Sequence, residues 1–122
     1  MATSTDEVRR VRELLNRSQF ADAAEASQAL LADSPDNRDV LYMLAVSQRY
    51  LNLIEEALAT LAELEKHHPD YGRLFQERGH CYVTRRAAEP AIEAFTRAVA
   101  LNGSLPASCM RVLEFRGRKS NL

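Results

Sequence analysis

The sequence predicts an all-α protein built from helical hairpins. Its 122 residues contain only 4 Gly and 4 Pro and are rich in Ala, Leu, Glu and Arg, which are strong helix formers. Apolar residues follow the spacing of one helix face, as at Leu41, Leu44 and Ala45. Similar residues also return every 34 positions along the chain. These observations predict stacked helix pairs, the architecture of helical repeat proteins with a period of this length.

The 34-residue period is visible in several columns at once. Pro35 and Pro69 are separated by this interval, and Gly103 follows after the same distance. Five further columns keep the spacing: Val11, Ala45 and Gly79; Phe20, Ile54 and Ala88; Ala23, Ala57 and Ala91; Ser27, Leu61 and Phe95; Leu30, Leu64 and Ala98. The chain therefore divides into repeat 1 (4–37), repeat 2 (38–71) and repeat 3 (72–105).

Each repeat is expected to contain two helices joined by a short linker. In repeat 2 the helical spacing predicts helices over 39–51 and 55–68, with the linker "NLI" between them. Pro69 is expected to end the second helix, since proline is common just after helix ends. Pro90 of repeat 3 aligns with Glu56, which places it in the first turn of a helix, where its missing N–H costs nothing.

On these residues the chain resembles the tetratricopeptide repeat family over roughly residues 4–105. The period and the helix-turn-helix content match the family. So do residues of several columns: the small Ala45 and Gly79, the alanines Ala23, Ala57 and Ala91, the aromatics Phe20 and Phe95, and the prolines Pro35 and Pro69. Two departures stand out. The frequent tryptophan of the first helix is replaced by Glu7, Leu41 or Phe75, and Val11 occupies the small position of repeat 1.

The resemblance implies αα-hairpin repeats in a right-handed superhelix, with the first helix of each repeat lining a concave groove. Eight side chains are then expected to line this partner-binding groove: Arg12, Tyr42, Val46, Arg49, Tyr50, Arg73, Gln76 and His80. Arg and Tyr are enriched in binding hot spots, and Arg binds carboxylates with two hydrogen bonds. We expect a peptide or protein partner that carries acidic and apolar residues. The alternative is that these are ordinary solvated positions on a scaffold.

Residues 106–122 begin like a fourth repeat, with Cys109, Val112 and Leu113 at first-helix apolar positions. They are expected to form either a capping helix over 106–117, which repeat arrays need at an apolar end, or a truncated fourth repeat, followed by a basic tail. Residues 73–108 also resemble the array that precedes the catalytic domain in bacterial repeat-containing sulfotransferases. This second resemblance implies the N-terminal repeat region of a bacterial sulfotransferase-like protein, whereas a truncated fourth repeat would make the chain a fragment of a longer array.

No catalytic, cofactor or metal site is expected. His67 and His68 are adjacent, so their side chains leave the helix in different directions. Glu77 and His80 have the spacing of one di-iron ligand pair, but the second copy that such sites need is missing. Cys81 and Cys109 lack the spacing of a zinc or redox motif.

The charge of the chain is nearly balanced in total but uneven along its length. A net charge of −1 argues against nucleic acid or a membrane surface as the partner, and no apolar run suggests a signal or a membrane span. A cytoplasmic location is therefore expected. Residues 1–71 carry 7 Arg or Lys and 13 Asp or Glu, whereas residues 72–122 carry 9 and 4. This polarity favours a homo-oligomer built head to tail, or it reflects drifting composition on a solvated surface.

Three functions are compatible with these observations. The first is a non-catalytic protein-protein interaction module, a scaffold or adaptor that binds a partner in its groove. The second is the accessory repeat region of a larger enzyme, such as a sulfotransferase. The third is a self-associating assembly module.

Overall fold

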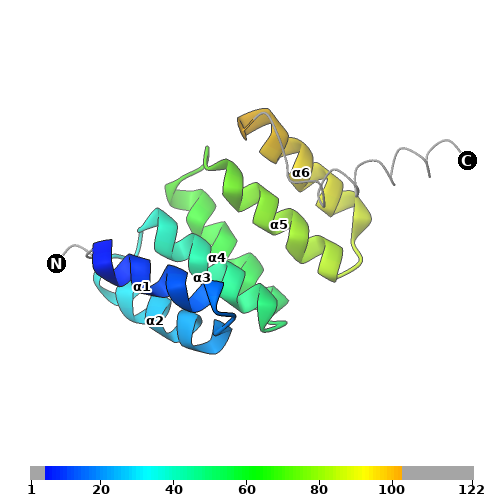
Figure 1. The fold of residues 1–122 in the computed structure, drawn as a ribbon. Coiled ribbons are helices and arrows are strands. Elements are labelled where there is room, and N and C mark those ends of the chain that lie inside the picture. The colour runs from blue at the N-terminus through cyan, green and yellow to red at the C-terminus, as the bar shows by residue number, and fades with distance from the viewer. Residues whose placement is uncertain (1–4, 103–122) are drawn as a thin grey trace, which may run out of the picture. The chain divides into compact units, whose positions relative to one another are not determined.

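The computed structural model describes residues 5–102, which hold six α-helices (Figure 1). The helices are α1 (Thr5–Asn16), α2 (Phe20–Asp33), α3 (Arg38–Tyr50), α4 (Ile54–His67), α5 (Gly72–Thr84) and α6 (Ala88–Asn102). The predicted all-α helical repeat fold is confirmed. Each pair of successive helices lies inside one of the predicted repeat ranges. The helix expected over 106–117 lies outside the described residues.

The helices form two compact units, divided after Pro69. In the N-terminal unit α1 packs on α2 and α3, α2 packs on α3, and α3 packs on α4. In the C-terminal unit α5 packs on α6. The helical hairpin is thus the building block of both units.

The turn inside each hairpin has the same backbone geometry. Ser18, Asn52 and Arg86 have φ angles of 60°, 63° and 60°, in the left-handed region. The residue after each of them donates its N–H to a carbonyl five positions back: Gln19 to Leu14 at 2.9 Å, Leu53 to Gln48 at 2.8 Å and Ala87 to Tyr82 at 2.8 Å. This is the Schellman ending of a helix, formed here without glycine. The left-handed residues are 34 positions apart, so the backbone conformation of the turns repeats with the same period as the sequence.

The helix ends agree with the predicted roles of the prolines. α4 ends at His67, before Pro69, and Pro90 is the third residue of α6. The linker of repeat 2 was predicted one residue too late. Ile54 is the first residue of α4 and only 8% exposed, because the hairpin buries its side chain. Asn37 caps the N-terminus of α3, and its Oδ1 accepts a hydrogen bond of 3.1 Å from the N–H of Val40.

The core of the N-terminal unit forms along the predicted helix faces. Leu41, Leu44, Ala45 and Gln48 of α3 are all buried, as are Ala57, Leu61 and Leu64 of α4. A cluster of Val11, Ala23, Val40 and Met43 joins the first three helices. Half-buried side chains pack against this cluster, among them Leu14, Leu30 and Tyr42.

The core of the C-terminal unit is built around two phenylalanines. Phe95 of α6 is fully buried, and its ring lies where a Cβ on Gly79 of α5 would have to be. Glycine therefore allows the close approach of the two helices at this point. Phe75 of α5 lies under two guanidinium groups, with the Cζ of Arg97 at 4.7 Å and that of Arg78 at 5.3 Å from its ring centroid. Such cation–π contacts let arginines cover a buried aromatic ring.

Candidate functional site

The predicted groove residues are divided between the two units. Arg12 of α1 and Tyr42, Val46, Arg49 and Tyr50 of α3 belong to the N-terminal unit. Arg73, Gln76 and His80 of α5 belong to the C-terminal unit. All eight side chains are exposed or half-buried.

An aromatic stack lies at one end of the N-terminal set. The rings of Tyr50 and Phe20 are nearly parallel, 6° apart, with centroids separated by 4.5 Å. The Cζ of Arg49 lies 4.4 Å from the Tyr50 centroid. Tyr50 is therefore in contact with both the Phe20 ring and the Arg49 guanidinium group. Tyr50 is still 56% exposed, so more than half of its surface remains accessible to a partner.

The stack follows from the order of the helices. Tyr50 is the last residue of α3 and Phe20 is the first residue of α2, and these helices pack against each other. Because they run in opposite directions, the end of one meets the start of the other (Figure 1). Arg49 and Tyr50 were predicted from the sequence as groove residues, whereas Phe20 was recognised only as a repeat position. The sequence signal for the stack is an aromatic residue directly after the α1–α2 turn and another directly before the α3–α4 turn.

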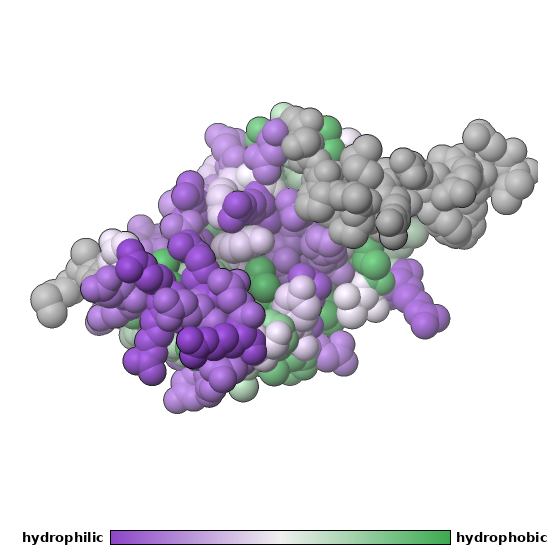
Figure 2. Space-filling model, viewed as in Figure 1, coloured by the Kyte–Doolittle hydropathy of each residue, from purple (hydrophilic) through white to green (hydrophobic). Residues whose placement is uncertain are grey.

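Exposed apolar side chains continue from the stack into the turn between α3 and α4. Leu51 and Leu53 are 37% and 44% exposed and follow Tyr50 closely in the chain, so they add apolar surface next to the stack. Figure 2 shows hydrophobic atoms at this end of the unit, whereas the visible surface of α1 and α2 is mostly hydrophilic. We call the five residues Phe20, Arg49, Tyr50, Leu51 and Leu53 the turn surface.

Two other predicted residues have structural contacts of their own. Tyr42 packs against the core cluster of the N-terminal unit and is half-buried. The ring of His80 meets that of Phe95 edge-on, at 5.4 Å between centroids and 77° between planes. Substitution of either residue will therefore disturb packing as well as any contact with a partner.

The two remaining histidines make contacts within the N-terminal unit, and Cys81 is buried in the C-terminal unit. The Nε2 of His67 lies 3.2 Å from Glu63 Oε1 on the same helix. The Nε2 of His68 lies 2.7 Å from the backbone oxygen of Asp36, in the loop before α3. Cys81 is buried in α5. Within residues 5–102, no cluster of His, Cys, Asp and Glu is placed to hold a metal ion, and no helix is long and apolar enough to cross a membrane.

Comparison with known proteins adds a family match and a set of similar folds. A family model described as "Tetratricopeptide repeat" matches residues 14–78, more than half of the chain. No curated protein matches the sequence.

Among solved structures, the tetratricopeptide domain of Sgt2 from Aspergillus fumigatus is similar, with a TM-score of 0.84 and 18% identity over 98% of this chain and 82% of that one. The Yersinia enterocolitica type III secretion translocator chaperone SycD has a TM-score of 0.85 and 15% identity, over 98% of each chain. SycD in complex with a peptide of the translocator YopD has a TM-score of 0.84 and 13% identity, over 94% of this chain and 92% of that one. At such identities these structures share the fold.

Proposed function

The chain belongs to the tetratricopeptide repeat family, and on that premise we propose that it is a protein-interaction module whose main partner site is the turn surface. The module is non-catalytic and acts as a scaffold. Arg12, Tyr42 and Val46 extend the site along the first helices of the N-terminal unit. Arg73, Gln76 and His80 are further contacts on the C-terminal unit.

The observation that carries this proposal is the ordered stack of Phe20, Tyr50 and Arg49. Arginine and tyrosine lose rotamer entropy when a partner immobilises them, and this loss weakens binding. Here stacking already restrains both side chains within the unit. Their immobilisation therefore costs less than that of isolated surface residues, and this favours their use as anchors.

The chemistry of the turn surface defines the partner. Leu51 and Leu53 offer apolar contact, and the guanidinium of Arg49 suits a carboxylate. Residues 5–69 carry 12 Asp or Glu and 7 Arg or Lys, so a polyacidic segment would be repelled by the unit as a whole. The partner that fits is a peptide segment with apolar residues beside a single carboxylate. The complex of SycD with a YopD peptide is an example of peptide binding by a protein of similar fold. The accessory region of a larger enzyme stays a prediction.

A selection of random displayed peptides on the full chain tests the proposal. We expect the selected peptides to combine apolar residues with one carboxylate. Tyr50→Ala should weaken their binding about 30-fold, the equivalent of roughly 2 kcal/mol for a hot-spot residue. Arg49→Lys keeps the charge but loses the planar stacking group, and it should weaken binding less.

Leu101→Ala provides the matched control, because Leu101 is a 39% exposed apolar residue on α6. Its peptide affinity should equal that of the wild type. Peptides that bind Tyr50→Ala as tightly as the wild type would show that the turn surface is not the partner site.

A further inference from the structure

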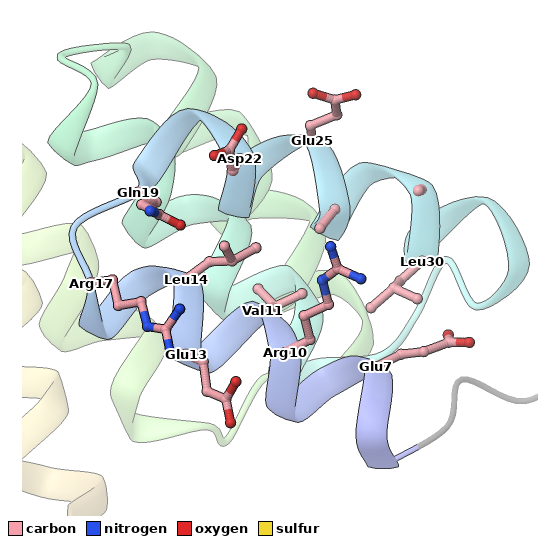
Figure 3. A pocket seen from close by; sticks show the side chains of 12 residues that line it. Glu7, Arg10, Val11, Glu13, Leu14, Arg17, Gln19, Asp22, Glu25 and Leu30 are labelled. Carbon is pink, nitrogen blue, oxygen red and sulfur yellow. The ribbon is translucent and has the colours of Figure 1, made fainter.

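The N-terminal unit also has an open hollow of about 780 Å³ between α1 and α2 (Figure 3). Its apolar lining comes from both helices and consists of Val11, Leu14, Ala26, Ala29 and Leu30. Arg10 projects from α1 toward α2 in Figure 3. The hollow shares no residue with the turn surface, so a ligand here is independent of the proposed partner site.

Charged groups surround this apolar lining, and acidic ones predominate. Glu7, Glu13, Asp22 and Glu25 contribute four carboxylates, against the two guanidinium groups of Arg10 and Arg17. In Figure 3, Glu13 and Glu25 lie on opposite sides of the hollow, one on each helix. An apolar floor with acidic sides suits an amphipathic segment that carries positive charge.

A helical hairpin cannot bury both of its faces alone, and repeats solve this by stacking on their neighbours. In this unit α1 and α2 pack against α3, and the hollow is formed by these same two helices. The half-buried Leu14 and Leu30 of its floor are apolar surface that a docked segment would remove from water.

The sequence contains a segment of matching charge. Residues 103–122 carry Arg111, Arg116, Arg118 and Lys119 but only one acidic residue, Glu114. The same segment includes the apolar residues Val112, Leu113 and Phe115. We propose that the hollow between α1 and α2 docks the basic segment 103–122 of a second copy of this chain.

A contact between two copies is favoured over one within a single copy. In repeat proteins each repeat packs on its sequence neighbours only, and the first repeat is not a neighbour of the segment that follows the third. The two surfaces are different, so the contact is heterologous and leads from one copy to the next. It joins copies into rings or open chains.

Sedimentation of the full chain tests this docking. We expect association at an ionic strength of about 0.01 M that weakens strongly at about 0.15 M, because the screening length falls from about 30 Å to about 8 Å. Glu13→Lys with Glu25→Lys should raise the dissociation constant about tenfold or more at low salt, since each change replaces an attraction by a repulsion.

Asp33→Lys with Asp36→Lys is the matched control. It makes the same change in net charge on exposed residues of the N-terminal unit that do not line the hollow. This variant should associate nearly as the wild type does. Circular dichroism should show the same helix content and melting for the wild type and for both pairs of substitutions.

A mixing experiment separates docking between copies from other effects of charge. Arg116→Glu with Arg118→Glu should abolish association of the chain that carries it. Mixed with the Glu13→Lys, Glu25→Lys chain, it should associate again, because each hollow then meets a segment of opposite charge. The proposal is overturned by a wild-type chain that stays monomeric at low salt, by equal effects of the hollow and control variants, or by a mixture that does not associate.

Discussion

The α3–α4 hairpin of the N-terminal unit and the α5–α6 hairpin of the C-terminal unit fill the space between their two helices with side chains of different sizes. At equivalent positions the first has Ala45 and Leu61, and the second has Gly79 and Phe95, all of them buried. The larger ring in the second hairpin occupies the space that a methyl group on Gly79 would need. A bigger residue on one helix is thus matched by a smaller one on the other.

The α1–α2 hairpin has the reverse arrangement, with the larger residue of the pair on its first helix. It has Val11 and Ser27 at the same positions, both fully buried. Val11 is the largest residue of its column, and Ser27 is the smallest of its own. The departure of Val11 from the usual small residue is therefore compensated. What the repeat preserves is the volume between two helices, because cores pack at a nearly constant density.

The largest effect is expected in the alanine column, where the two hairpins have the same residue. Ala57 and Ala91 are both fully buried, and Arg at either position would bury an unpaired charge between helices. Ala57→Arg and Ala91→Arg should each lower the free energy of unfolding by about 3–5 kcal/mol. Urea titration measures this loss.

Arginine at exposed positions of the same two helices provides the control. Ala59→Arg and Ala100→Arg should stay within about 0.5 kcal/mol of the wild type. If Ala57→Arg melted within about 2 °C of the wild type, the equivalence of the two alanines would be refuted.

A medium effect is expected where the hairpins differ most. Gly79→Ala should destabilise the protein by about 1–3 kcal/mol, although alanine is the better helix former, because the new Cβ overlaps the Phe95 ring. Adding Phe95→Leu recreates the pair of the α3–α4 hairpin and should recover part of this loss. A double-mutant cycle from urea titrations should give a coupling of about 1 kcal/mol or more. Additive effects would contradict the exchange of volume between the two positions.

The smallest expected effect compares the turns of the same hairpins. Arg86 has a left-handed backbone that costs arginine roughly 1–2 kcal/mol and glycine almost nothing. Arg86→Gly should therefore raise the free energy of unfolding by about 0.5–1 kcal/mol. Asn52→Gly should raise it less, since asparagine tolerates this conformation. Loss of stability in Arg86→Gly, measured by urea titration, would mean that its side chain has a role beyond the turn.

Much of the fold was predictable, because its signals repeat at short range. Helical spacing identified the buried face of α3, and Pro69 and Pro90 were correctly placed at the end of one helix and the start of another. The left-handed turns were not predicted. They contain Ser18, Asn52 and Arg86, and the glycine that normally signals such a turn is absent from all three.

The sequence by itself determined the period, the helices and the residues of the first-helix faces, since each depends on residues within a few turns of one another. The tertiary structure alone decided which distant side chains meet. Phe20 stacks on Tyr50 across 30 positions of sequence, and the ring of Phe95 fills the space beside Gly79. Such contacts depend on the distance between two packed helices, and this distance cannot be deduced from a periodic pattern in the sequence.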